Sequence, residues 1–169
     1  MGHWALSRAH VLSGNLETAR ESIGTAIDLN PNYATAQYFQ GWVAMQLGDH
    51  AFCVDRIDLA QRLSPYDPLI YGMRGVSAMS LALMDRREEA LVRVGKALEH
   101  PDMHYQAHAM AAAILALVGE RDLARRELQR VRTVVPDYDT KEFFSVYAFQ
   151  DDEDVRRITQ AFEEIKRNS

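Results

Sequence analysis

Residues 41–65 read GWVAMQLGDHAFCVDRIDLAQRLSP, and the positions of their small residues recur at a spacing of 34 along the chain. This spacing joins Gly14 to Gly48, Ala19 to Cys53, Ala26 to Ala60, Pro31 to Pro65, Ala90 to Ala124 and Ala97 to Val131. Small residues at a fixed period, separated by proline, are typical of stacked helical hairpins. Because such arrays present extended surfaces, the period points to binding rather than to catalysis.

The prolines mark where one hairpin ends and the next begins: all five, Pro31, Pro65, Pro68, Pro101 and Pro136, fall at such boundaries. Proline lacks an N–H and breaks the interior of a helix. Between the prolines, apolar residues recur at helical spacing, and no segment alternates as a strand would. We therefore expect an all-α chain with helices at 4–13, 16–29, 33–47, 50–63, 67–84, 86–100, 102–118, 121–134, 139–150 and 153–167.

Glycine marks most of the expected turns within the hairpins. Gly14, Gly48 and Gly119 can each take the left-handed conformation that ends a helix. Asn15 and Asp49 follow two of these glycines, and we expect each to cap the next helix through a side-chain oxygen.

The third and last helix pairs depart from this scheme. Ala60 and Ala97 are 37 residues apart, so three residues are added, and we place them near 68–71 in a longer helix or linker. The turn of this hairpin, 84–86, contains no glycine. In the last pair an acidic run at 151–154 replaces the usual turn, as expected for the polar cap of a repeat array.

The composition is that of an ordinary globular chain: 169 residues, 47% hydrophobic and 25% charged, with a net charge of -5. The negative charge argues against a nucleic-acid surface. The single cysteine, Cys53, occupies a small packing position, and we expect a buried, unreactive thiol in a reducing compartment. The most apolar run, 107–118, is shorter than the roughly 20 residues that span a bilayer, and no signal peptide is visible. We therefore expect a cytoplasmic protein without membrane contact.

This residue pattern resembles the tetratricopeptide repeat over about residues 3–138. The small residues, the turn glycine and the proline of that motif match Leu6, Gly14, Ala19, Ala26 and Pro31, then Gly41, Gly48, Cys53, Ala60 and Pro65, then Ala78, Ala90 and Ala97, and finally Ala112, Gly119, Ala124 and Pro136. The resemblance implies a right-handed superhelix in a single domain, with repeats at about 3–32, 33–67, 68–103 and 104–137 and capping helices at 138–169. The family's tryptophan position holds His3, Gln37, Arg74 and His108 instead.

A narrower resemblance concerns one internal stretch and the end of the chain. The stretch RLSPYDP at 62–68, and the ending with Pro136, Phe143, Phe144, the acidic run 151–154 and Phe162, are similar to the repeat region of bacterial signalling proteins. In those proteins the repeats follow a class III nucleotide cyclase or a winged-helix DNA-binding domain. The resemblance implies that this chain is the regulatory part of a larger signalling protein, and no catalytic residue of those domains carries over.

The first helix of each hairpin lines the concave groove of such an array. The positions expected to face it are Trp4, Arg8 and Val11, then Tyr38, Trp42 and Met45, then Gly75, Met79 and Ala82, and finally Ala109, Ala113 and Ala116. Trp, Tyr and Arg dominate binding hot spots, and Met adds an adaptable apolar contact. We therefore predict a non-catalytic protein–protein interaction module that binds a protein or peptide segment there. Alternatively, Tyr38, Trp42 and Met79 complete the core or touch the chain's own terminal helix.

Two other functions stay open on the sequence. An exposed repeat edge at Trp4 and Leu6 would let two chains associate as a homodimer. The groove could also serve as an apolar pocket that senses a small ligand. The Lys and Asn clamp with which some tetratricopeptide domains bind a C-terminal carboxylate is absent from the corresponding positions.

Three polar clusters have structural explanations. His100, His104 and His108 lie one turn apart but lack the glutamate of a metalloprotease helix. The acidic run 151–154 lacks the ligand pattern of a calcium loop and suits a helix N-terminus. The arginines of 121–132 alternate with acidic residues, as on a salt-bridged face. We expect no metal, no cofactor and no nucleic-acid partner.

Overall fold

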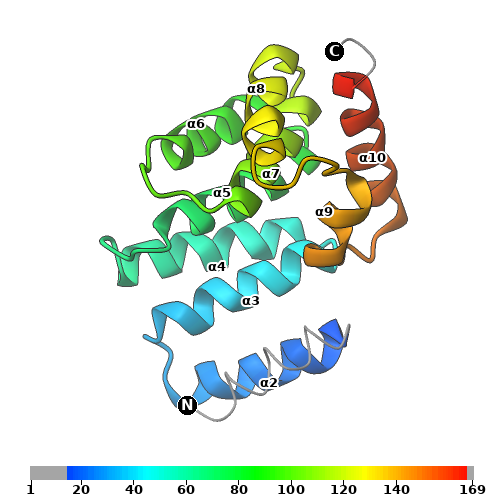
Figure 1. The fold of residues 1–169 in the computed structure, drawn as a ribbon. Coiled ribbons are helices and arrows are strands. Elements are labelled where there is room, and N and C mark those ends of the chain that lie inside the picture. Colours follow the sequence, from blue (N-terminus) through cyan, green and yellow to red (C-terminus); the bar gives the residue numbers. More distant parts are fainter. Residues whose placement is uncertain (1–14, 167–169) are drawn as a thin grey trace.

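The computed structural model describes residues 15–166, and within that range the chain folds into nine helices and no strand (Figure 1). The helices are α2 (Leu16–Leu29), α3 (Ala34–Gln46), α4 (His50–Leu63), α5 (Ile70–Leu83), α6 (Arg87–Leu98), α7 (Tyr105–Leu117), α8 (Arg121–Arg132), α9 (Thr140–Val146) and α10 (Asp152–Lys166). None of these helices is long and apolar enough to cross a membrane. The expected all-α class is confirmed. The helix expected at 4–13, with Trp4, Arg8 and Val11, lies outside the described residues.

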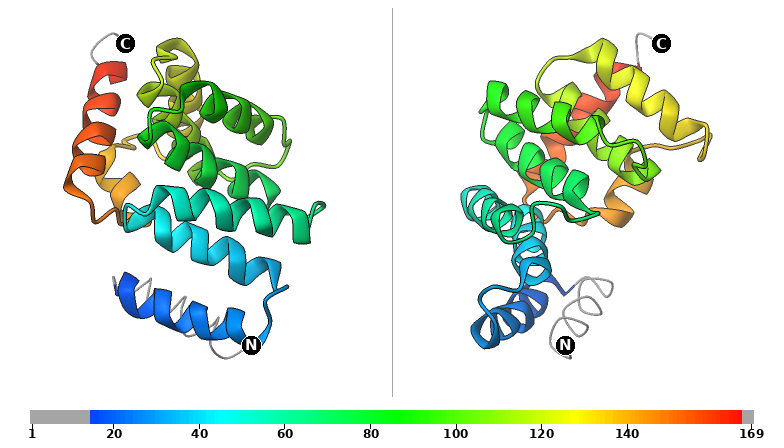
Figure 2. Two further views of the ribbon diagram at one scale, coloured as in Figure 1. Left: turned by 180° about the vertical axis from the view of Figure 1, so that it is seen from behind. Right: turned by 90° about the vertical axis from the view of Figure 1, so that its left-hand side faces the viewer.

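Consecutive helices pair as hairpins, and the hairpins stack in chain order. α3 packs on α4, α5 on α6 and α7 on α8, while α4 also contacts α5 and α5 contacts α7. The hairpins follow one another from the cyan to the yellow part of the ribbon, each turned relative to the one before (Figures 1 and 2). The chain is therefore a superhelix of helical hairpins.

The small residues of the repeat allow the helices to approach each other closely. A Cβ added to Gly41 in α3 would lie 2.9 Å from Cδ1 of Ile57 and 3.1 Å from the carbonyl oxygen of Cys53, both in α4. Ala60 and Ala97, which the sequence pattern treats as equivalent, are both buried. The period thus corresponds to positions of helix–helix contact.

Three hairpin turns share one backbone conformation, although only two of them contain glycine. Gly48 and Gly119 have φ angles of 82° and 84°, and Asp85 has a φ of 60° in the turn without glycine. Aspartate is one of the few residues that tolerate this left-handed conformation. Its carboxylate accepts a hydrogen bond of 2.6 Å from Nη2 of Arg157, so the side chain joins this turn to α10.

The helix caps differ from those expected at Asn15 and Asp49. Neither side chain accepts a hydrogen bond from the helix that follows it. Side-chain caps occur instead at His104, before α7, and at Asp139, which forms a reciprocal capping box with Glu142. The backbone explains the difference, because His104 and Asp139 are extended whereas Asn15 and Asp49 have ψ angles of 70° and 68°. An extended N-cap residue is the one whose side chain reaches back to the helix.

Extra residues before the third hairpin lie mostly in a linker. α5 begins at Ile70 rather than at the expected residue 67, because the Asp67 carboxylate accepts a hydrogen bond of 2.9 Å from the backbone N–H of Leu69. This local bond holds the chain in a turn before the helix starts. The linker at 64–69 is consequently longer than the one at 30–33.

The C-terminal segment, residues 138–166, packs across the hairpins instead of continuing their stack. α9 ends at Val146, before the expected residue 150, and a non-helical stretch leads into α10. Gln46 holds this stretch at the end of α3. Its side-chain oxygen accepts a hydrogen bond of 2.6 Å from the N–H of Ala148, and its backbone oxygen accepts one of 2.8 Å from the N–H of Gln150.

Polar contacts tie α10 to three successive hairpins along the edge that carries their turns (Figure 2). Asp154 pairs with Nε2 of His50, at the start of α4, at 2.9 Å. Arg157 donates a hydrogen bond of 2.6 Å to the carbonyl of Leu83, at the end of α5. Arg125 of α8 donates one of 3.2 Å to a backbone carbonyl in the last turn of α10. α10 therefore fixes these hairpins relative to one another.

Candidate interaction surface

Six of the residues predicted to line the groove lie in the core. Met45, Met79, Ala109 and Ala113 are each 0% exposed, and Ala82 and Ala116 are 3% and 8% exposed. They belong to one apolar cluster with aromatic residues of the C-terminal segment, namely Phe143, Tyr147, Phe149 and Phe162. In an uncapped array these positions would face an open groove, but here α10 packs against α7, and the stretch before it is bonded to the end of α3. These six side chains therefore present little or no surface to a partner.

Tyr38 and Trp42 lie together on α3, and both remain partly exposed. With Tyr71 and Gly75 of α5 and Met110 of α7, they line a cavity of about 50 Å³. Helices α3, α5 and α7 all contribute to this cavity, and Gly75 is the residue predicted for the groove in the third hairpin that lines it.

Tyr147 adds a wall to the cavity from the C-terminal segment. Its hydroxyl donates a hydrogen bond of 3.1 Å to the backbone carbonyl of Gln106. Its ring centroid lies 4.8 Å from that of Phe143. Neither Tyr147 nor Tyr71 was among the residues predicted to line the groove. Tyr71 lies one turn before Gly75, so the helical spacing could have indicated that both residues face the same side. Tyr147 follows the end of α9, and no helical spacing relates it to the other cavity residues.

Tyr38 places its hydroxyl against the backbone of α5. A Cβ added to Gly72 would lie 2.8 Å from this oxygen, so glycine at this position lets the phenol approach the helix. Burial raises the pKa of the Tyr38 phenol, and likewise that of Tyr147, above the usual value near 10. Both phenols are therefore neutral at physiological pH and act as hydrogen-bonding groups rather than as acids or bases.

Trp42 connects this cavity with the N-terminal side of the array. Its ring stacks on that of Phe39, with centroids 5.4 Å apart and an interplanar angle of 23°. It also packs against an apolar cluster formed by Leu16 and Ala19 of α2 and Val43 of α3. The indole therefore contacts two separate parts of the core while keeping an exposed side.

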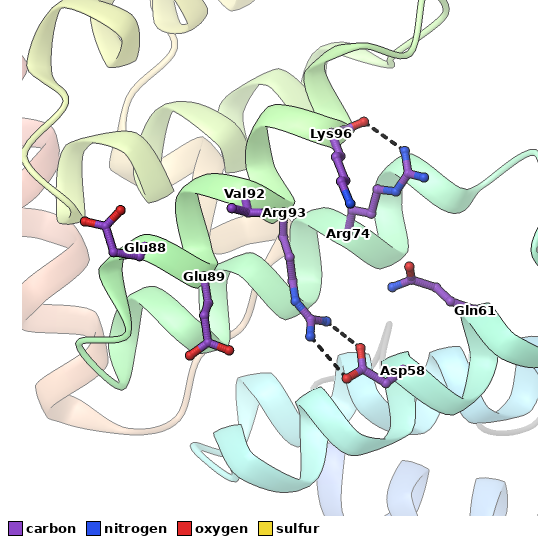
Figure 3. A pocket seen from close by; sticks show the side chains of 8 residues that line it. All are labelled: Asp58, Gln61, Arg74, Glu88, Glu89, Val92, Arg93 and Lys96. Carbon is purple, nitrogen blue, oxygen red and sulfur yellow. Dashed lines mark hydrogen bonds and ion pairs between the residues drawn. The ribbon is translucent and has the colours of Figure 1, made fainter.

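A larger depression lies between α4 and α6, the second helices of adjacent hairpins (Figure 3). Its volume is about 490 Å³, and its walls are mostly charged: Asp58, Gln61, Arg74, Glu88, Glu89, Val92, Arg93 and Lys96. Arg93 crosses it to Asp58 through two hydrogen bonds of 2.5 and 3.1 Å. Arg74 donates a hydrogen bond of 2.9 Å to the carbonyl of Lys96. The Asp58–Arg93 pair therefore joins α4 to α6 across the depression, which is a salt-bridged seam between hairpins.

The three histidines around the start of α7 do not converge. His104 caps that helix, and Nδ1 of His100 accepts a hydrogen bond of 3.4 Å from the N–H of Asp102. Nδ1 of His108 lies 2.7 Å from Oε2 of Glu127, on α8. Across residues 15–166, no three His, Cys, Asp or Glu side chains are placed to share a metal ion.

The arginines of α8 form a salt-bridged face. Their ion pairs are Arg121 with Glu164 at 2.7 Å, Arg125 with Asp122 at 2.8 Å and Arg130 with Glu127 at 3.4 Å. Because three of the basic groups are matched by acidic ones, the helix is a mixed-charge surface rather than a basic stripe.

The fold is of the tetratricopeptide type, a superhelix of stacked helical hairpins with a period near 34 residues. It is similar to the solved structure of YrrB, a TPR protein with an unusual peptide-binding site, with a TM-score of 0.60 and 19% identity over 98% of this chain and 86% of that chain. It is also similar to MamA (TM-score 0.60, 11% identity, 96% and 95% covered) and to the MamA RS-1 ArsTM double mutant (0.62, 14%, 98% and 93%). Identities this low show the fold alone. No protein-family model and no curated protein matches the chain.

Proposed function

We propose that the chain is a non-catalytic protein–protein interaction module that binds a protein or peptide segment beside Tyr38 and Trp42. The observation that carries this proposal is the placement of the pair, which is partly exposed next to an apolar cavity between α3, α5 and α7. Trp and Tyr are the side chains that most often dominate binding energy, since they bury a large area and keep a polar group. The peptide-binding site of YrrB, a protein of the same fold, supports a binding role.

Cys53, the single cysteine of the sequence, does not have the properties of a catalytic nucleophile. Cys53 is buried, and burial raises the pKa of its thiol to about 12. The thiol is therefore protonated at physiological pH, where only the thiolate would be a nucleophile. The phenols of Tyr38 and Tyr147 are neutral for the same reason.

The proposal extends to a regulatory role within a larger bacterial signalling protein in the cytoplasm. Its support is the sequence resemblance of residues 62–68, and of the aromatic ending of the chain, to the repeat regions of such proteins. The net charge of -5 and the paired arginines of α8 favour a protein partner over a nucleic acid.

Affinity capture from a bacterial lysate tests the binding site. The chain is compared with a Tyr38→Ala, Trp42→Ala double variant and with a Val92→Ala control, whose side chain is 58% exposed on α6. We expect one protein to be retained by the chain and the control and lost by the double variant. Because both rings pack on the core, cooperative unfolding of the double variant is checked first. Identical capture by all three would overturn the proposal and leave self-association or small-ligand binding.

Fluorescence gives a direct reading of the same contact. The chain has two tryptophans, Trp4 and Trp42, so a Trp4→Phe variant emits from Trp42 alone. Titration with the captured protein is expected to shift this emission, because the exposed side of the indole leaves water. An unchanged emission spectrum at saturation would place the contact elsewhere.

A further inference from the structure

We infer that the cavity beside Tyr38 and Trp42 is a pocket for one short, uncharged aliphatic side chain of the bound segment, such as that of valine or leucine. The inference rests on the proposed function and states which part of a partner this site recognises. Its basis is the chemistry of the cavity walls, the size of the cavity and the hydroxyl groups of the tyrosines that line it.

The walls of the cavity carry no ionisable group other than the tyrosine hydroxyls. Besides Tyr38, Trp42, Tyr71 and Tyr147, they consist of glycine, alanine, valine and methionine residues from α5, α6, the α6–α7 linker and α7. An ionised side chain placed there would lose its water without gaining a partner of opposite charge, which is unfavourable. An aliphatic side chain gains free energy from the same transfer.

The size of the cavity limits the occupant. Since one water needs at least 10–15 Å³ of such space, the 50 Å³ present has room for about four water-sized groups. This suits a branched aliphatic side chain and excludes an indole or a phenol. Gly75 sets part of this room, because a Cβ added there would meet only Cγ of Met110, at 3.7 Å.

The phenol hydroxyls of Tyr38 and Tyr71 can hold the backbone of the bound segment. Within residues 15–166, neither oxygen has a hydrogen-bonding partner in the chain itself. Tyr147, in contrast, donates its hydroxyl proton to the carbonyl of Gln106. A carbonyl of the segment would accept from Tyr38 or Tyr71 while its side chain enters the cavity.

The N-acetyl methylamides of leucine, glutamate and lysine are the probes for a direct test. The signals are the NMR resonances of the methyl groups of Met103 and Met110, because both residues line the cavity. We expect saturable shifts with the leucine compound and none with the glutamate or lysine compound. Equal shifts with all three, or a preference for either charged compound, would overturn the inference.

Two valine substitutions at helical glycines separate a filled pocket from a general change in the fold. Gly75→Val puts its methyl groups into the cavity, whereas Gly95→Val, on α6, adds them where no atom lies within 4 Å. Losing the burial of one aliphatic side chain corresponds to a loss of affinity of about tenfold to a hundredfold. We expect this loss for the leucine probe with Gly75→Val and less than a twofold change with Gly95→Val. If Gly75→Val unfolds, Gly75→Ala replaces it, with Gly95→Ala as its control.

The same variants distinguish failure of the pocket from failure of the binding site. If the captured protein is lost by the Tyr38→Ala, Trp42→Ala variant but binds Gly75→Val as it binds the parent chain, the surface binds a partner and the pocket inference is wrong. If the leucine probe binds and Gly75→Val abolishes its binding while no protein is captured, the pocket stands and the proposed protein partner does not.

Discussion

Replacing Gly41 by alanine tests whether the repeat period records helix–helix contact. The new Cβ would lie 2.9 Å from Cδ1 and 3.0 Å from Cγ1 of Ile57, and 3.1 Å from the carbonyl oxygen of Cys53. The Ile57 side chain can rotate, but the Cys53 oxygen belongs to the backbone of α4. The substitution must therefore move α3 away from α4, and we expect it to destabilise the fold.

The size of the effect follows from two opposing contributions. Inserting a methyl group into a packed core costs about 1–3 kcal/mol. Alanine instead of glycine in a helix interior contributes about 1 kcal/mol in the other direction. The Gly95→Ala control has only the second contribution, because nothing lies within 4 Å of its Cβ. We thus expect the two variants to differ by about 1–3 kcal/mol in their free energies of unfolding, with Gly95→Ala the more stable.

Urea denaturation of the two variants and the parent chain measures this difference. The transition midpoint is read together with the slope, since an unchanged slope shows that the same surface is exposed on unfolding. In thermal unfolding, each 1 kcal/mol corresponds to about 2–4 °C for a domain of this size. If Gly41→Ala stabilises the fold as much as Gly95→Ala does, Gly41 is not a contact residue, and the packing argument for the period fails.

Three further predictions follow from the turns, from α10 and from the buried tyrosines. Asp85→Gly should be more stable than Asp85→Ala by about 1 kcal/mol in urea, because both lose the carboxylate but only alanine is strained at positive φ. Arg157→Ala should lower the free energy of unfolding by about 1–2 kcal/mol, because its bonds to the end of α5 are lost. Arg156→Ala, which removes only an exposed ion pair, should lower it by less than about 0.5 kcal/mol. Equal losses would contradict the prediction that α10 holds the hairpins together. Because burial raises the pKa of Tyr38 and Tyr147, the folded chain keeps their protons above the unfolded pKa of about 10, and stability should fall as the pH rises beyond that value. An ultraviolet titration in which all phenols ionise before unfolding would refute this.

The repeat spacing was enough to predict most of the helices. The predicted bounds 16–29 and 50–63 agree with those of α2 and α4. These helices begin and end beside turn residues that can be recognised from the local sequence. The start of α5 was placed too early, because the bond from the N–H of Leu69 to the carboxylate of Asp67 has no signature in the apolar pattern. The local sequence pattern thus predicted where the helices lie, and the errors concern the residues at which they begin or end.

The candidate site could be predicted only in part, because it depends on contacts between distant segments. Tyr38 and Trp42 were found from their residue type and helical position. Met45 was placed on the groove because nothing in the sequence shows that the C-terminal segment returns to the end of α3. The hydrogen bond that brings this segment back joins Gln46 to Ala148, which are 102 positions apart in the sequence. A contact between residues so far apart in the sequence cannot be predicted from the spacing of the repeat.

The contacts of the C-terminal segment also bear on how tightly the cavity can bind. Tyr147 is fixed from one side by its bond to the carbonyl of Gln106 and from the other by the bond between Ala148 and Gln46. A wall that is held in place before a ligand arrives loses little freedom on binding, and this freedom is a main cost of association. A Gln46→Ala variant removes the side-chain bond while leaving Tyr147 itself intact. This variant should therefore bind the leucine probe with lower affinity, because the probe dissociates faster. The methyl resonances of Met103 and Met110 should still shift at saturation. If the affinity is unchanged, the cavity does not depend on the C-terminal segment for its shape, and α3, α5 and α7 alone form the pocket.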